Sequence, residues 1–205
     1  MIKPVRLLFP ALLAAMALPI LSATAAPLST SDKKDIARVE DYLNDISSLK
    51  AKFLQVNAEG QIAEGDVFMR RPGRMRFEYK PPAQILVVAD GTWLILHDKE
   101  LEETNRLPLS ATPVSVLLKK DVRLEGDVTV VSVEKDANTL RLNIIDTDEP
   151  DEGGITLVFE NKPLKLRKWL VTDAQGNTTS VALSDVERGI ALKPELFTFS
   201  DYEYD

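Results

Sequence analysis

The stretch that decides the fold is residues 70–82, RRPGRMRFEYKPP. Successive side chains of a β-strand alternate between its two faces, so Met75, Phe77 and Tyr79 share one face. Arg71 joins that apolar face if the intervening proline-glycine kink keeps the phase. An unpaired guanidinium is costly to bury. Arg71 is therefore expected either to latch an apolar concavity or to lay its aliphatic stem on the surface with its charged head in water.

The residues around this stripe extend the two-faced pattern. Val67 and Met69 continue the apolar face upstream, whereas Arg70, Arg74 and Arg76 are expected to face water. Large apolar side chains in such a stripe are most often core. The sequence thus predicts a strand with one buried face and one basic, solvated face, on which Arg74 and Arg76 are available to an acidic partner.

Short β-like runs separated by turns follow this strand. Asp90 and Gly91 join the apolar runs 85–89 and 92–97 as a tight hairpin, and residues 173–177 form a second hairpin turn. The first hairpin, ILVVADGTWLIL, is apolar on both faces, more than a sheet with one wet face requires. A helix or a ligand must therefore cover its second face.

One long amphipathic helix is predicted over residues 29–48. Val39 and Leu43 recur at helical spacing, and Ser29 with Asp32 makes a plausible capping pair. The helix precedes all of the predicted strands.

A second, shorter helix is predicted over residues 112–119. Pro113 suits the first helical position, and Val114 and Leu117 share a face. About ten short strands with these helices predict a mainly β (α+β) fold, in which a large antiparallel sheet curls and is covered by helix.

The first residues are typical of a secretory signal peptide. Lys3 and Arg6 precede the apolar run 7–21, which is followed by small residues. The run is too short and too interrupted by proline to span a membrane stably. Residues 1–25 are thus predicted to be cleaved, leaving residues 26–205 as a single exported domain.

Charge and cysteine content exclude several classes of protein. The chain has 25 Lys+Arg and 32 Asp+Glu, and without Lys3 and Arg6 the balance is 23 against 32, a formal charge of −9. A nucleic-acid partner needs a basic surface and is not expected. The chain contains no cysteine, so it has no disulfide, thiolate metal site or lipid-modified cysteine.

No residue set nominates catalysis or metal binding. The single histidine, His97, has no second histidine or cysteine to share a metal, so a structural or surface role is expected. The acidic segment 146–154 fails the EF-hand pattern because Pro150 occupies the third ligand position. It is predicted to be a solvated loop, and the chain is predicted to use no metal, cofactor or catalytic residue.

Several stretches, in this order, resemble the periplasmic outer-membrane lipoprotein carrier family, LolA. They are SSLKAKFLQ (47–55), EGDVFMRRPGRMRFEY (64–79), QILVVADGTWLILHD (84–98), LPLSATPVSVLL (107–118), KWLVTDAQGNTTSVAL (168–183) and FTF (197–199). The resemblance covers most of the exported chain. One departure is Met75, which stands where an aromatic residue soon follows the arginine-proline pair in the family.

The resemblance implies an incomplete antiparallel β-barrel, closed by an N-terminal helix and short lid helices around an apolar cavity. In such carriers the arginine of the arginine-proline pair, here Arg71, holds the lid shut by hydrogen bonds to lid backbone carbonyls. The acyl-chain cavity is then expected to be lined by Phe53, Val67, Met69, Met75, Phe77, Tyr79, Trp93, Val114 and Leu117.

The function implied is that of a monomeric, periplasmic, non-enzymatic carrier. It would take acylated lipoproteins from an ATP-driven releasing complex in the inner membrane and deliver them to a receptor in the outer membrane. Two alternatives stay open: a periplasmic lipid-sensing or lipid-binding protein on the same fold, and an exported hydrolase with an apolar cleft. Activity on an acyl ester would distinguish the hydrolase.

Overall fold

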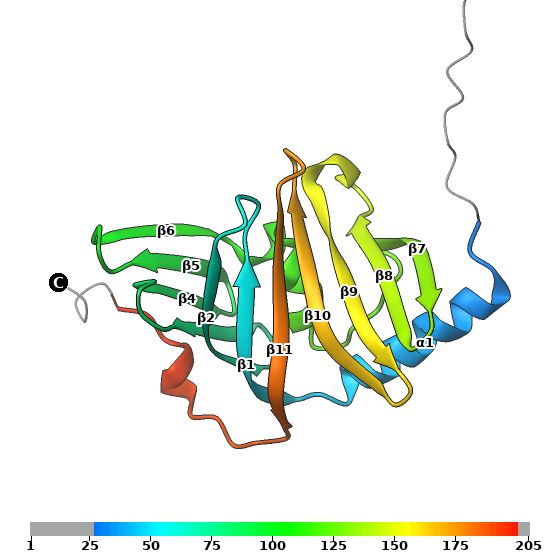
Figure 1. Cartoon of the computed structure of the whole chain (residues 1–205), viewed down its shortest axis with the longest axis horizontal. Helices are drawn as coiled ribbons and strands as arrows, with labels where there is room; N and C mark the ends of the chain where they lie inside the picture. Colours follow the sequence, from blue (N-terminus) through cyan, green and yellow to red (C-terminus); the bar gives the residue numbers. More distant parts are fainter. Residues whose placement is uncertain (1–26, 201–205) are drawn as a thin grey trace, which may run out of the picture.

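A computed structural model describes residues 27–200, so the predicted signal peptide lies outside the described residues. The described strands form one sheet in the order β6-β5-β4-β3-β2-β1-β11-β10-β9-β8-β7. They are β1 (Ser48–Val56), β2 (Ile62–Arg70), β3 (Arg74–Tyr79), β4 (Ile85–Asp90), β5 (Trp93–Asp98), β6 (Glu103–Pro108), β7 (Val128–Asp136), β8 (Thr139–Asp146), β9 (Gly153–Asn161), β10 (Leu164–Asp173) and β11 (Thr178–Arg188). Figure 1 shows the sheet curling around a concave side.

Every pairing in the sheet is antiparallel, and the barrel is incomplete. Neighbours along the chain pair as hairpins, except that β1 pairs with β11 in the middle of the sheet. Within residues 27–200 the edge strands β6 and β7 do not pair with each other. The predicted curled antiparallel sheet is therefore confirmed, as are the hairpins at Asp90–Gly91 and at residues 173–177.

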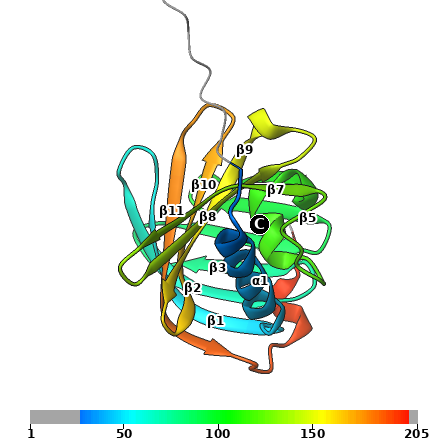
Figure 2. The same cartoon turned by 90° about the vertical axis from the view of Figure 1, so that its right-hand side faces the viewer.

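Helix α1 (Thr30–Asn44) lies on the concave side of the sheet (Figure 2). It begins with the predicted capping box, in which Ser29 Oγ accepts from the backbone N–H of Asp32 and the Asp32 carboxylate accepts from the backbone N–H of Ser29. Val39 and Leu43 are buried against the sheet. The helix ends four residues before the predicted boundary, because residues 48 onward enter β1.

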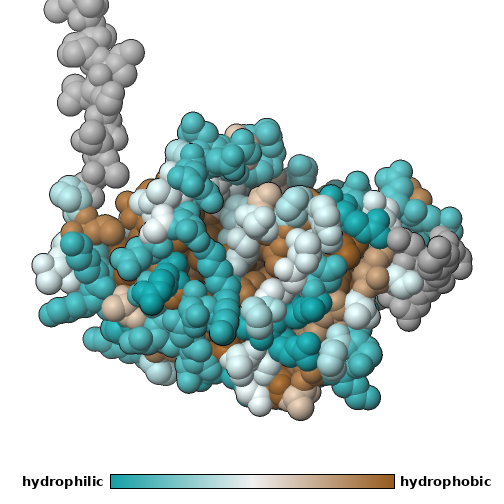
Figure 3. Space-filling view, turned by 180° about the vertical axis from the view of Figure 1, so that it is seen from behind, coloured by the Kyte–Doolittle hydropathy of each residue, from teal (hydrophilic) through white to brown (hydrophobic). Residues whose placement is uncertain are grey.

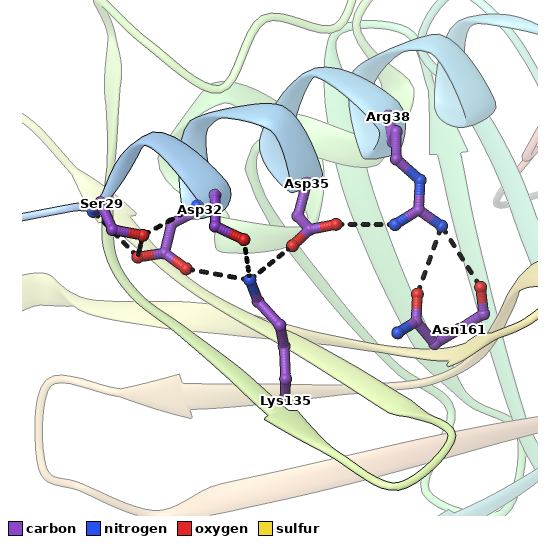
Figure 4. Close-up of polar contacts among 7 residues, drawn as sticks. Ser29, Asp32, Asp35, Arg38, Lys135 and Asn161 are labelled. Carbon is purple, nitrogen blue, oxygen red and sulfur yellow. Dashed lines mark hydrogen bonds and ion pairs between the residues drawn. The ribbon is translucent and has the colours of Figure 1, made fainter.

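A polar network fixes the polar side of α1 to the sheet (Figure 4). Lys135 of β7 extends its Nζ to Asp35 Oδ2 at 2.7 Å and to Asp32 Oδ1 at 3.2 Å. Arg38 donates from Nη1 to Asp35 Oδ1 at 2.6 Å and from Nη2 to the backbone and side-chain oxygens of Asn161, both at 3.2 Å. The helix is thus held to β7 and to the end of β9.

Two short 3-10 helices, η1 (Leu109–Ala111) and η2 (Pro113–Leu118), cover the rest of the concave side. We call residues 109–124 the lid, because Val122 and Leu124 beyond η2 are also buried in the same core. The predicted short helix is thus present but wound as a 3-10 helix. Seen from the side that carries α1 and the lid, the surface is mainly polar, with apolar side chains visible in patches (Figure 3).

The convex side of β3–β5 is covered by the chain after β11, residues 189–200, which we call the C-terminal strap. It contains η4 (Pro194–Phe197), and Phe197 is fully buried. The strap runs beneath β2–β4 in Figure 1. Leu86, Val88 and Ile95 of the convex face are buried as well, so the doubly apolar hairpin is covered on both faces by parts of the chain itself.

The strap corrects the expectation that Arg70 and Arg76 face water. Arg70 Nη1 donates to Leu192 O at 3.1 Å, and its guanidinium lies 5.3 Å from the centroid of the Phe197 ring. Arg76 Nη1 donates to Leu196 O at 3.3 Å, and its side chain is only 13% exposed. The alternation of faces was predicted correctly, but both arginines are partly covered and donate hydrogen bonds to backbone carbonyls of the strap.

The acidic segment 146–154 connects β8 to β9 and holds the one-turn helix η3 (Pro150–Glu152).

Among residues 27–200, no helix is long and apolar enough to cross a membrane.

Candidate functional site: an apolar cavity under the lid

A small cavity lies between the concave face of the sheet and the lid. Its lining is Leu43 and Ile46 from α1 and the segment after it, Leu49, Val67, Met69, Met75, Leu166, Trp169 and Leu183 from the sheet, Arg71 from the turn between β2 and β3, and Leu117 from the lid. The space inside is about 20 Å³, enough for about one water molecule. An acyl chain can enter only if the lid moves outward.

Arg71 is the charged residue in this lining. Its Nε donates to the lid carbonyl of Leu117 at 2.9 Å, and its backbone N–H donates to Ser47 O at 2.9 Å. Two residues on, the backbone N–H of Gly73 donates to Leu118 O at 2.8 Å. The turn between β2 and β3 thus holds the end of η2 by two hydrogen bonds, one from a side chain and one from the backbone.

The terminal nitrogens of Arg71 differ from its Nε in their hydrogen bonding. Both Nη1 and Nη2 are buried, and neither has a hydrogen-bond partner among the described residues. Burial lowers the pKa of the Arg71 guanidinium to about 10. The group is still cationic at neutral pH, so the closed lid encloses a charge with two unused donors.

The other end of the lid is tied to α1. Asn44 pairs with the backbone of Val122 through both amide atoms, accepting from its N–H at 2.8 Å and donating to its carbonyl at 3.0 Å. The carboxylate of Glu40 accepts from the backbone N–H of Leu124 at 2.6 Å. The lid is therefore fastened on both sides, to the β2–β3 turn and to the helix.

An aromatic cluster extends the apolar face beyond the cavity. The Phe53 ring makes edge-on contacts with Phe77 and Tyr79, at centroid distances of 5.0 and 4.9 Å. Tyr79 donates its hydroxyl to Gln55 Oε1 at 2.7 Å, and burial raises its pKa to about 12. A Cβ at Gly65 would overlap the backbone carbonyl oxygen of Glu78 and lie 2.7 Å from the Phe53 ring, so the glycine allows both β3 and this ring to pack closely against β2.

Eight of the nine predicted lining residues lie on the cavity side. Val67, Met69, Met75 and Leu117 line the cavity itself. Phe53, Phe77 and Tyr79 form the aromatic cluster beside it, and Val114 is a partly buried residue packed against the same core. Whether any of them contacts an acyl chain stays a prediction.

Trp93 is a wrong prediction for the cavity. Met69, Met75, Ala89 and Leu94 are paired in register across β2–β5, and directly paired residues share a face. The residue before Leu94 must point the other way. Trp93 accordingly lies on the convex face and is 42% exposed.

Comparison with known proteins gives the family. The family profile described as "Outer membrane lipoprotein carrier protein LolA" matches residues 44–200. The chain belongs to the LolA family. An outer-membrane lipoprotein carrier protein of Pseudomonas fluorescens is 30% identical over 90% of this chain and 92% of its own length. An outer-membrane lipoprotein carrier protein of Nitrosomonas europaea is 26% identical over 97% of this chain and 96% of its own length.

A solved structure supports the fold alone. A DUF1329 family protein from Desulfovibrio piger superposes with a TM-score of 0.51 at 10% identity, covering 82% of this chain and 96% of that one. Both the family profile and the relative from Pseudomonas fluorescens carry the description of an outer-membrane lipoprotein carrier protein, so the apolar cavity under the lid is the candidate site for a lipid-bearing cargo.

Sequence reasoning missed several residues in the lining of this LolA-family cavity. Leu166 and Trp169 are three positions apart, which puts them on opposite faces of a regular strand. A register shift between Leu166 and Lys168 turns both inward. Leu49 and Leu183 could have been predicted from the alternation of side chains along β1 and β11. Leu166 and Trp169 could not, because the bulge in β10 has no clear signal in the sequence.

His97 is a buried residue of the convex face. It is 5% exposed, and its Nδ1 lies 3.0 Å from Thr104 Oγ1. Its ring also packs against Phe199 of the strap, at a centroid distance of 5.4 Å. Residues 27–200 contain no group of three His, Asp or Glu side chains placed to hold a metal ion.

Proposed function

We propose that this protein is a non-enzymatic periplasmic carrier that binds the acyl chains of lipoproteins in the cavity under the lid. The observation that carries the proposal is the cavity itself, whose lining is apolar except for Arg71. Each acyl CH₂ removed from water contributes about 0.8 kcal/mol, so a lipoprotein needs such a cover to cross an aqueous compartment. Family membership supports the same cargo class.

Residues 1–25 act as the export signal in this proposal, and residues 26–205 form the carrier domain. Cargo comes from an ATP-driven lipoprotein-releasing complex of the inner membrane and goes to a lipoprotein receptor of the outer membrane. The carrier works as a monomer. These partners are the ones that a shuttle of acylated proteins between two membranes requires.

The latch on the lid gives the transfer its direction. Loading must break the bond from Arg71 Nε to Leu117 O, and a hydrogen bond to a charged group contributes about 1.5–3 kcal/mol. Cargo binding is weakened by that amount, which favours release to an acceptor of higher affinity. A carrier whose affinity included the full free energy of burying the acyl chains would not release its cargo.

The test is lipoprotein release from inner-membrane spheroplasts into a soluble one-to-one complex, measured by intact mass spectrometry. Leu49 lines the cavity, whereas Leu54 of the same strand is 43% exposed. We expect Leu49→Gln to reduce the yield of complex severely and Leu54→Gln to leave it unchanged, with thermal unfolding confirming that both variants fold. Equal yields from both variants would contradict the cavity as the binding site.

A further inference from the structure

The two unused donors of Arg71 are the strongest unexplained feature of the molecule. Nη1 and Nη2 are buried without a hydrogen-bond partner among the described residues, while Nε is already bonded to Leu117 O. Buried donors left unpaired are costly, and a guanidinium offers only donors. An acceptor brought into the cavity would remove this cost.

The cavity itself supplies no such acceptor. Apart from Arg71, the described residues of its lining are leucine, isoleucine, valine, methionine and tryptophan, which contribute no carboxylate or amide side chain. The enclosed space holds about one water molecule. Any stronger acceptor must therefore arrive with a ligand.

Arg71 also stands where the apolar interior gives way to solvent. The next two residues, Pro72 and Gly73, border a surface groove that Ser110, Ser115 and Leu118 of the lid also line. A lipid with its chain in the cavity and its head in this groove would pass Arg71 at the point where the hydrocarbon ends. In an acylated lipid, that point carries the carbonyl group.

We propose that the terminal nitrogens of Arg71 bind an acyl ester carbonyl oxygen of the cargo. The inference rests on the proposed function and adds to it a recognition element for the ester linkage. Charge-assisted hydrogen bonds of this kind are stronger than neutral ones. Arg71 thus has two roles, in which Nε fastens the empty lid and Nη1 and Nη2 select lipids that carry a carbonyl where the chain begins.

The experiment compares two synthetic lipopeptides with the same peptide and the same chain lengths, one with glyceryl ester linkages and one with ether linkages. Equilibrium binding is measured with residues 26–205. We expect the ester to bind at least about tenfold more tightly, the effect of one charge-assisted hydrogen bond. Because both probes displace the lid equally, the ratio of their affinities is independent of the latch.

Variants assign the preference to Arg71. Arg71→Leu should bring the ratio of ester to ether affinity close to one, and Arg71→Lys should retain part of it, since an ammonium lacks the planar fork. Met75→Leu, a change of similar volume in the same lining, should keep the full ratio. Thermal unfolding checks that each variant folds.

The outcomes separate this inference from the proposed function. Equal affinities for ester and ether in the unchanged chain, or a ratio that survives Arg71→Leu, would overturn carbonyl recognition while leaving the carrier role intact. If Arg71→Leu weakened only the binding of palmitate, a third probe, the site would recognise a free carboxylate and the ester assignment would be wrong. Failure to bind either lipopeptide would contradict the carrier role itself.

Discussion

At the scale of single residues, the proposed latch role of Arg71 rests on two opposing contributions to the free energy of lid closure. Closing the lid forms one hydrogen bond to Leu117 O and also buries the guanidinium, whose pKa falls to about 10. The bond stabilises the closed lid, whereas the loss of hydration opposes it. Because these two contributions act in opposite directions, we expect the proposed latch to hold the lid closed while still allowing it to open.

The charge of Asp35 stabilises the packing of α1 against the sheet, through its ion pair with Lys135 of β7. Burial raises the pKa of the Asp35 carboxyl, but the hydrogen bonds from Lys135 and Arg38 together lower it by more than burial raises it. The net pKa is therefore below the ordinary value. The stabilisation is therefore present above the unfolded pKa of about 3.9 and is lost as pH falls through the lower folded pKa. We expect Asp35→Ala to cost about 1–3 kcal/mol at neutral pH.

Urea unfolding at pH 7 and at about pH 3 measures this effect. The difference between Asp35→Ala and the unchanged chain should shrink at the lower pH, where the carboxyl begins to be protonated in both states. Asp41 is exposed on the same helix, so Asp41→Ala is the matched control and should have little effect at either pH. A loss from Asp35→Ala that did not depend on pH would show that packing, not charge, is responsible.

Much of the residue-level arrangement could be predicted from the sequence, because strand alternation and helix capping are local. The capping pair and the inward row of Met75, Phe77 and Tyr79 follow from neighbouring residues alone. Trp93 was placed in the cavity on the family resemblance, but the pairing of β5 with β4 turns Leu94 inward and Trp93 to the convex face. Trp169 was missed because a bulge changes the phase of its strand.

At the scale of elements, the C-terminal strap is the part that sequence reasoning did not foresee. Phe197 fills a fully buried site on the convex face, where Leu86, Val88 and Ile95 are also buried. The strap is further held by Ser48 Oγ, which donates to Ile190 O at 2.7 Å. It packs on strands more than 90 residues earlier in the chain, and no local pattern predicts such a contact.

The strap contributes to stability mainly through Phe197. We expect Phe197→Ala to lower the free energy of unfolding by about 3–5 kcal/mol, the usual loss for a buried phenylalanine. Phe199→Ala, two residues further on at a partly exposed site, should cost clearly less. Denaturant unfolding of both variants checks the prediction. Equal losses in the free energy of unfolding would show that Phe197 is not the main contribution of the strap to stability.

At the scale of the whole molecule, the sheet carries two separate apolar layers. The lid and α1 cover the concave layer, and the strap covers the convex layer. The β2–β3 region contacts both covers, because Arg70 binds the strap while Arg71 binds the lid. Opening of the concave side is expected to leave the convex side packed.

This independence can be measured with single cysteines, since the chain has none of its own. Val116 of the lid and Val88 under the strap are 2% and 0% exposed. Asn44→Ala removes both hydrogen bonds to Val122 and should speed thiol labelling of Val116→Cys by about tenfold. Labelling of Val88→Cys should not change. Equal acceleration at both sites would mean that the protein opens globally rather than at the lid.

The pairing of β1 with β11 has a consequence for how the chain folds. Leu49 pairs with Arg188, a separation of 139 residues, whereas the other pairings in the sheet join strands that are neighbours along the chain. Local hairpins close quickly, but a contact between distant segments pays a larger loop-closure entropy. Two meanders, β1–β6 and β7–β11, can therefore organise separately, and the central seam that unites them into one chamber forms only after the last strand has been synthesised.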